Sequence, residues 1–294
     1  MKTNIFFLGS ILWVFLLSGV TSRIVEAMDG MRYALIIGNE KYTTLNSLDN
    51  PVKDARGMKK ALEKVGFYVM YKENLPNKQA MQATIEKFVQ NLDYGTVGLF
   101  YYAGHGVQVN NKNYLIPTAV NFRSEREVEE LALSATDDVL RKMENRKSKF
   151  NLIILDACRD SFFPKTRSLW NPQRHFVKKR GLAGMGSMGY EDTATFIVFS
   201  TAPNQVAFDG GVDEEHSPFT KNFIRGIKTP GLTLKRMLEV VAKKVKEETS
   251  YSQIPYHTYV GPSESINFCF SGCRKTRRQP RRQPRTVLPI IINP

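Results

Sequence analysis

Uninterrupted apolar runs alternate along the chain with segments whose apolar residues recur every three or four positions. The runs are typical of strands buried on both faces of a sheet. One of these runs begins at Thr96, and we expect the last strand to lie at the edge of the sheet. We expect strands at Arg32–Gly38, Phe67–Tyr71, Thr96–Ala103, Leu152–Leu155, Thr193–Thr201 and Ile266–Phe270.

The segments with helical spacing lie between these runs, and most begin with a residue suited to the first turn of a helix. Asn50-Pro51 predicts a helix that Asn50 caps, and Ser124–Glu130 is read as a charge-rich loop. Gln108–Asn113 indicates a hairpin turn. The alternation predicts an α/β sheet covered on both faces. The other helices are expected at Asn77–Leu92, Ser134–Asn145, from Ser217-Pro218 onward, and around Leu234–Val245.

Two residues with catalytic chemistry directly follow apolar runs. His105 lies between two glycines, and Cys158 follows Asp156-Ala157 at the end of its run. In a parallel sheet both residues would lie at the carboxyl edge, where substrates bind. Their separation is 158 − 105 = 53 residues. The alternative for Cys158 is a buried core thiol, because free cysteine is among the most buried residue types.

The YAGHG sequence around His105 and the DACR sequence around Cys158 together resemble the caspase-like cysteine peptidases. The aspartate two positions before the cysteine resembles metacaspases, paracaspases and bacterial caspase-like proteins, and GNEKY after the first strand resembles their G-x-N-x-Y. The resemblance covers about Arg32 to Phe270. It implies the caspase–haemoglobinase fold, an α/β fold with a mostly parallel six-stranded sheet.

The resemblance also implies a site. His105 would be the base for the thiol of Cys158, and the backbone N–H groups of Gly106 and Cys158 would bind the oxyanion. Asp54 and Asp156 match the acids of the substrate pocket, and Asp209 is a third candidate. Carboxylates would favour arginine over lysine, because a guanidinium binds them in a bidentate manner.

Both main pocket acids have local alternatives. Asp54 could simply complement the dipole of its helix, and Asp156 could bond a local turn. The family function implied is an endopeptidase that acts on proteins or peptides with Arg or Lys before the cut. The competing interpretation is a caspase-like interaction or signalling module with little or no peptidase activity.

The segment Ser161–Asp192 has no strong periodicity and directly follows the nucleophile. It is basic and rich in glycine. We expect a functional loop in which the enzyme cuts itself, and Arg180-Gly181 is the favoured bond. The alternative is an intact lid, because long loops serve either purpose.

The net charge of +14 is unevenly distributed. Seven basic residues and no acid lie within residues 271–294, so half of the charge belongs to this tail. Repeated Arg-Arg-Gln-Pro favours disorder. Aromatic residues do not interleave with these charges, so nucleic-acid binding is not expected.

The first 27 residues have the organisation of a secretory signal, with Lys2 before the uncharged run Ile5–Val20. We expect a secreted or exported protein, and the alternative is a membrane anchor through residues 5–20. The predicted domain is therefore 28–270. Cys269 and Cys273 could form a small disulfide loop in that compartment or remain unpaired.

No cofactor is expected. His175, His216 and His257 lack the spacing of metal ligands and are interpreted as ordinary surface or loop residues. Asp137 and Asp138, near Glu125–Glu130, leave calcium as an alternative, although a hard cation needs several oxygens and a capping role explains Asp137.

Overall fold

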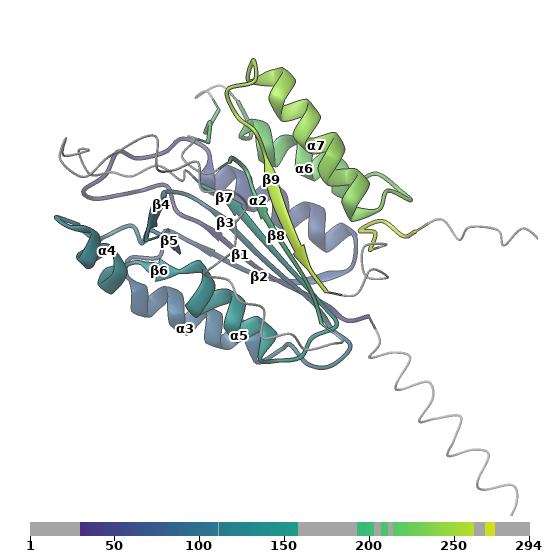
Figure 1. The fold of residues 1–294 in the computed structure, drawn as a ribbon, viewed down its shortest axis with the longest axis horizontal. Coiled ribbons are helices and arrows are strands. Elements are labelled where there is room, and N and C mark those ends of the chain that lie inside the picture. The colour runs from purple at the N-terminus through teal and green to yellow at the C-terminus, as the bar shows by residue number, and fades with distance from the viewer. Residues whose placement is uncertain are drawn as a thin grey trace, which may run out of the picture.

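A computed structural model describes residues 30–110, 112–157, 193–202, 207–210, 214–261 and 268–273. Within these residues the chain forms a six-stranded sheet in the order β2-β1-β3-β7-β8-β9 (Figure 1). Every neighbouring pair is parallel except β8 and β9, which confirms the mostly parallel sheet that the family resemblance implies. The strands are β1 (Arg32–Gly38), β2 (Phe67–Glu73), β3 (Val97–Ala103), β7 (Phe150–Asp156), β8 (Ala194–Phe199) and β9 (Tyr256–Val260).

Helices cover both faces of this sheet (Figure 1). Along β1, Ala34 and Ile36 join the core on one face, while Leu35 and Ile37 join the core on the other. This alternation explains why the buried part of β1, from Ala34 to Ile37, is apolar at every position. One face carries α2 (Pro51–Lys64), α6 (Pro218–Ile227) and α7 (Leu234–Glu248), and the other carries α3 (Lys78–Val89), the π-helix η1 (Ala135–Leu140) and α5 (Arg141–Glu144).

A small antiparallel sheet follows β3. It contains β4 (Gly106–Val109), β5 (Lys112–Leu115) and β6 (Leu133–Ser134), and helix α4 (Glu125–Leu131) contacts β4. The pairing of β4 with β5 confirms the predicted hairpin. Gly106, the residue that follows His105, begins β4, so this small antiparallel sheet holds it in place.

Three sequence predictions are wrong. Ser124–Glu130 forms helix α4 rather than a loop, because Ser124 caps it by accepting from the N–H of Glu127 and because Val128 is buried. The edge strand is β9, whereas the described part of Ile266–Phe270 makes one isolated bridge, from Cys269 to Thr233. Asn50 starts α2 without a side-chain cap.

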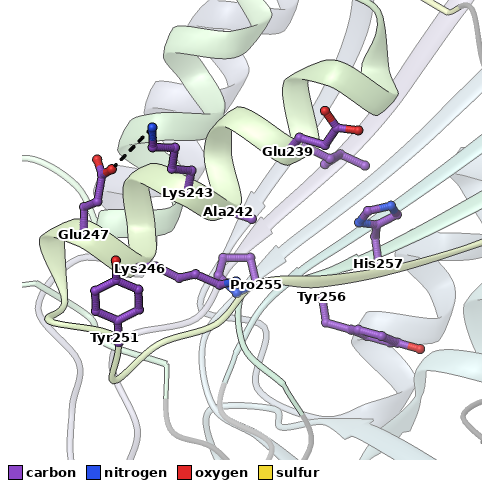
Figure 2. Close-up of a pocket in the computed structure, with 10 residues that line it drawn as sticks. Glu239, Ala242, Lys243, Lys246, Glu247, Tyr251, Pro255, Tyr256 and His257 are labelled. Carbon is purple, nitrogen blue, oxygen red and sulfur yellow. Dashed lines mark ion pairs between the residues drawn. The ribbon is translucent and has the colours of Figure 1, made fainter.

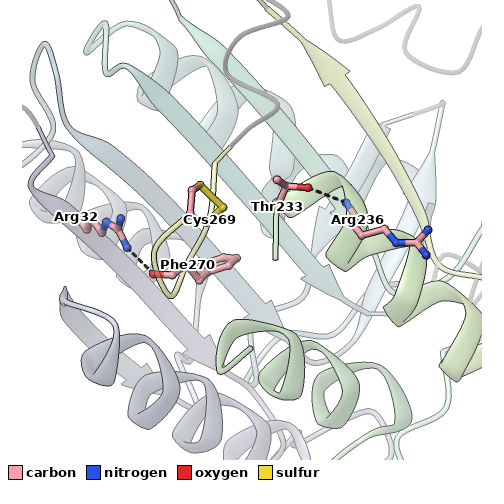
Figure 3. The surroundings of a disulfide bond; sticks show 6 residues. Arg32, Thr233, Arg236, Cys269 and Phe270 are labelled. Atoms are coloured by element: carbon pink, nitrogen blue, oxygen red, sulfur yellow. Dashed lines mark hydrogen bonds between the residues drawn. A yellow bond between two sulfur atoms is a disulfide. The ribbon is translucent and has the colours of Figure 1, made fainter. Parts of the chain in front are cut away.

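Cys269 and Cys273 form a disulfide in the structure, with their Cα atoms 5.3 Å apart (Figure 3). Within this loop, the carbonyl of Phe270 accepts a 2.8 Å hydrogen bond from Nη1 of Arg32, the first residue of β1. The disulfide therefore lies where the parallel strands begin. None of the helices in the described ranges is long and apolar enough to cross a bilayer. The predicted signal, the Ser161–Asp192 loop and residues 274–294 of the tail lie outside the described residues.

Candidate active site

Strand register brings the two chemical motifs to one edge of the sheet. Gly38, Ala103 and Asp156 end β1, β3 and β7, and they are direct neighbours across the three strands. The N–H of Gly104 donates to the carbonyl of Asp156 at 3.2 Å. His105 follows Ala103 by two residues, and Cys158 follows Asp156 by two. The structure describes the chain as far as Ala157, so Cys158 itself lies just beyond the described residues.

Backbone and ring contacts hold His105 in one orientation. Its N–H donates to the hydroxyl of Tyr42 at 2.8 Å, and its ring centroid lies 4.4 Å from that of Tyr42. Nε2 lies 2.8 Å from the carbonyl oxygen of Asn46. This contact requires a proton on Nε2, which leaves the basic lone pair of the ring on Nδ1. Burial lowers the pKa of His105, which favours the neutral form that a base needs.

Gly104 allows the chain to turn between β3 and His105. Its φ of 150° lies in a region that favours glycine. A Cβ at this position would meet the hydroxyls of Tyr42 and Tyr102 at 2.6 and 2.8 Å. These are the hydroxyls that contact the His105 backbone, since Tyr102 also donates to its carbonyl at 2.9 Å. Crowding by these two hydroxyls therefore explains why the position before His105 in the YAGHG sequence is a glycine.

The three predicted pocket acids come together. They line one small cavity of about 30 Å³, next to the ends of β3 and β7. Phe208, which also lines the cavity, is 45% exposed. The complete lining is Leu48, Pro51, Asp54, Ala103, Gly104, Asp156, Ala157, Ala207, Phe208, Asp209 and Ser217.

Asp54 is in the first turn of α2 and only 1% exposed. Its Oδ1 accepts hydrogen bonds from Nδ1 of His216 at 3.0 Å and from the N–H of Ser217 at 3.1 Å. Burial raises the pKa of Asp54 to about 7, and the His216 hydrogen bond opposes that rise. An acid that only complemented the helix dipole would gain nothing from a burial that costs solvation energy.

Asp156 is also buried, and it bonds across the fold rather than within its own turn. Its Oδ2 accepts from the hydroxyl of Ser217 at 2.7 Å and from that of Thr220 at 2.8 Å, both at the start of α6. Burial raises the pKa of Asp156, and these two donors oppose the shift. The local-turn interpretation of Asp156 therefore does not describe the contacts that the structure gives it.

Asp209 joins the loop after β8 to the start of α2. Its Oδ2 accepts from the backbone N–H of Asp49 at 2.6 Å, and its carbonyl accepts from the side chain of Asn50 at 2.7 Å. Oδ1 of Asn50, the atom that would cap α2, instead accepts from Nζ of Lys53 at 3.0 Å. Burial raises the pKa of Asp209 as well.

Sequence reasoning missed the donors around these acids. The sequence predicts an ordinary surface or loop residue at His216, but its side chain is 14% exposed and bonds Asp54. At Ser217 the sequence indicates only the start of a helix. It does cap α6, since its hydroxyl accepts from the N–H of Thr220 at 3.0 Å. The same hydroxyl also donates to Asp156, and no local pattern announces that second bond.

Asp137 and Asp138 have protein partners. Asp137 makes ion pairs with Lys112 and Arg141, and Asp138 accepts from the side chain of Gln82 at 2.9 Å. The described ranges contain no group of three His, Cys, Asp or Glu side chains arranged to hold a metal ion. Arg180 lies outside the described residues.

A larger hollow of about 540 Å³ lies between α7 and β9 (Figure 2). His257 and Tyr256 line it from the strand, and Lys243 and Glu247 form an ion pair at 3.8 Å on the helix. None of the predicted site residues is among its lining residues in the described chain.

The family model of the caspase domain matches residues 31–264. Among curated proteins, human mucosa-associated lymphoid tissue lymphoma translocation protein 1 is 30% identical over 130 residues, and its mouse homologue matches equally. The match covers 44% of this chain and 15% of each relative.

Solved structures share the fold. A crystal structure of a Geobacter sulfurreducens protein has a TM-score of 0.57 at 15% identity, covering 81% of this chain and 97% of its own. Caspase-1 from Spodoptera frugiperda has a TM-score of 0.54 at 16% identity, covering 84% of this chain and 91% of its own. This architecture is the caspase–haemoglobinase fold that the sequence predicted.

Proposed function

Because the chain belongs to the caspase-domain family, we propose that it is a cysteine endopeptidase that cleaves after arginine and, less efficiently, after lysine. Caspase-like proteins act on protein substrates. The observation that carries the specificity is the convergence of Asp54, Asp156 and Asp209 on one cavity. That cavity borders the strand ends that lead to His105 and Cys158.

The proposed chemistry begins at the thiol. Nδ1 of His105 accepts the proton of Cys158, and the thiolate attacks the scissile carbonyl. The backbone N–H groups of Gly106 and Cys158 stabilise the oxyanion. The imidazolium then gives its proton to the leaving amine, and a water activated by His105 releases the acyl group from the sulfur. The bond between Nε2 and Asn46 supports this assignment, because it leaves Nδ1 as the base.

A cationic side chain suits the cavity because its walls supply negative charge. A guanidinium can bond two carboxylates with separate N–H groups, whereas an ammonium acts as a compact charge. The cavity is small, about 30 Å³, and Phe208 in its lining is 45% exposed.

We extend the proposal to self-processing at Arg180-Gly181. Arg180 supplies the preferred head group, and the glycines after it let the chain extend into the site. Mass spectrometry should find fragments ending at Arg180 in the active protein and not in Cys158→Ala. A full-length loop in a protein that cuts peptides would contradict self-processing alone.

We also propose that the enzyme works outside the cytoplasm, exported by residues 1–27 or tethered through residues 5–20. The disulfide between Cys269 and Cys273 supports an oxidising compartment. Fractionation of cells that express the full chain tests this, and a reduced protein in the cytosol would contradict it.

The decisive experiment is cleavage of peptide libraries by purified residues 28–294, with calcium and with a chelator. We expect cuts after Arg, fewer after Lys and none after Asp. Cys158→Ala and His105→Ala should each abolish cleavage, whereas the matched variant His257→Ala on β9 should retain it. A folded Cys158→Ala protein that still cleaves would exclude this nucleophile. Peptide binding without cleavage would favour the interaction module.

A further inference from the structure

His216 lies immediately before α6, at the place where that helix meets α2 beside the acid cavity. Its side chain is 14% exposed, and its Nδ1 is 3.0 Å from Oδ1 of Asp54. The packing surface for its ring is Gly57 of α2. A Cβ at Gly57 would lie 2.4 Å from Cε1 of His216 and 2.7 Å from Nε2. The missing side chain at Gly57 therefore makes room for an imidazole that reaches Asp54.

The two donors from the start of α6 fix the direction of the Asp54 carboxyl. His216 and the N–H of Ser217 both bond Oδ1, at 3.0 and 3.1 Å. Oδ2 accepts one longer hydrogen bond, from the same Ser217 nitrogen at 3.4 Å. Asp54 also lines the cavity. Oδ1 is thus the more strongly engaged oxygen, and Oδ2 keeps more of its capacity to accept from a ligand.

Charges around Asp54 oppose its ionisation. The negative charge of Asp156, on β7, raises the pKa of Asp54, and the charges of both acids raise the pKa of the buried hydroxyl of Tyr101 on β3. The charge of Asp209 also raises the pKa values of Asp156 and Tyr101. Glu215, 91% exposed, lies 3.9 Å from Nε2 of His216. His216 is the basic side chain in direct contact with Asp54.

We propose that His216 is a positioning residue for arginine recognition: it orients the Asp54 carboxyl through Oδ1 and favours its charged form, and thereby lowers the pH at which the enzyme binds an arginine side chain. This role rests on the proposed function. The imidazole of His216 donates its Nδ1–H to the carboxylate of Asp54 and so favours the charged form of Asp54. Without that donor Asp54 would take up a proton at higher pH, and a neutral carboxyl attracts a guanidinium far less.

The test compares three variants by kcat and KM on an arginine peptide from about pH 5 to 9. His216→Phe keeps a ring against Gly57 but has no donor. His216→Asn keeps an N–H near the position of Nδ1 and does not titrate. His257→Phe removes a histidine from β9, beside the separate hollow (Figure 2).

We expect His216→Phe to raise KM about tenfold near neutral pH while kcat changes little, and to move the acidic limb of kcat/KM upward by about one pH unit. His216→Asn should restore most of the affinity, and His257→Phe should match the wild type. Gly57→Ala, which crowds the imidazole, should shift the limb in the same direction as His216→Phe. It supplies the same test if His216→Phe does not fold.

The outcomes separate this role from the proposed function. A wild type that neither cleaves nor binds arginine peptides would overturn both. An active, folded His216→Phe enzyme with an unchanged acidic limb and KM would overturn the positioning role and leave the peptidase intact. Equal losses in His216→Phe and His216→Asn would also overturn it, because the donor would then not be what matters.

Discussion

Tyr42 connects the loop after β1 to the residue that would act as the base. Its hydroxyl accepts from the N–H of His105 at 2.8 Å and lies 3.3 Å from the hydroxyl of Tyr102. Burial raises the pKa of Tyr42 well above its ordinary value, so the hydroxyl keeps its proton at all working pH values. The hydroxyl of Tyr42 therefore orders the backbone of His105, and the ring of Tyr42 contacts the imidazole.

We expect Tyr42→Phe to leave the His105 N–H without this acceptor and to lower the free energy of unfolding by about 1–3 kcal/mol. The value of kcat should fall more than KM rises, because His105 loses a hydrogen bond that fixes its backbone while the acids of the cavity do not change. Chemical denaturation and steady-state kinetics measure both. Tyr33→Phe, at the other end of β1, is the control. Unchanged kcat in Tyr42→Phe would show that Asn46 alone orients the imidazole.

Asp156→Asn tests the charge of the cavity with little change in shape. The amide oxygen can still accept from Ser217 and Thr220, so the fold should persist. Losing the charge should cost about 2–5 kcal/mol of arginine recognition. The readout is the ratio of kcat/KM for arginine and citrulline peptides, which differ mainly in charge. Asp137→Asn, at the distant start of η1, should leave that ratio unchanged. A ratio preserved in Asp156→Asn would place this carboxylate outside the pocket.

Individual contacts across the fold are what the sequence conceals. Asp54 and Asp156 could be predicted as candidates because each lies beside a recognisable motif. His216 could not, because it is 162 positions from Asp54 along the chain, and spacing rules act only within one helix or strand. The cap at Asn50 failed because a side chain competes for it: an asparagine before Pro51 favours capping, but its oxygen accepts from Nζ of Lys53 instead.

At the scale of elements, burial decides which segments a sequence reveals. The runs of β3 and β7 are buried at every position, so their patterns leave little choice. Strand β9 is mostly exposed, with one buried residue among five, and its mixed sequence predicts nothing clear. Helix α4 is dominated by charge, and its identity depends on one cap at Ser124 and one buried side chain at Val128.

The contact between β1 and α2 fixes the helix that carries Asp54. A Cβ at Gly38 would meet the carbonyl oxygen of Pro51 at 2.6 Å and the Cβ of Ala55 at 2.8 Å. We expect Gly38→Ala to push α2 outward, costing about 1–3 kcal/mol of stability, and to raise KM for arginine peptides. Gly226→Ala is the matched control, because its Cβ would meet the flexible side chain of Met237. Equal KM values in the two variants would contradict the prediction.

At the scale of the whole molecule, the acid cavity and the disulfide lie at opposite ends of the parallel strands. The acids lie where the parallel strands end, and the disulfide lies where they begin, beside Arg32. Replacing Cys269 and Cys273 by serine should lower the free energy of unfolding by about 2 kcal/mol, the value for so short a loop. The kinetics should not change. A loss of kcat with intact stability would show that the disulfide end influences the catalytic end.

The buried acids of the cavity can also be tested by measuring how the stability of the fold depends on pH. Burial raises the pKa values of Asp54, Asp156 and Asp209, that of Asp54 from 3.8 to about 7. Between these values the folded chain binds more protons than the unfolded chain. Stability is therefore greatest below the unfolded pKa and falls as the pH rises through the folded one. For Asp54 the loss is on the order of 4 kcal/mol.

We expect the thermal midpoint to fall from about pH 5 to 8, and Asp54→Asn to flatten that slope. Asp137→Asn is the control of opposite sign. Burial works to raise the pKa of Asp137, but its ion pairs with Lys112 and Arg141 hold that pKa below its usual value. Its contribution is therefore present above the unfolded pKa and lost as the pH falls. Agmatine, a free guanidinium ligand, should restore the midpoint at pH 8 more than at pH 5, because it binds the ionised cavity. If Asp54→Asn leaves the dependence of the thermal midpoint on pH unchanged, the Asp54 carboxyl is not the group whose burial destabilises the fold at the proposed arginine site.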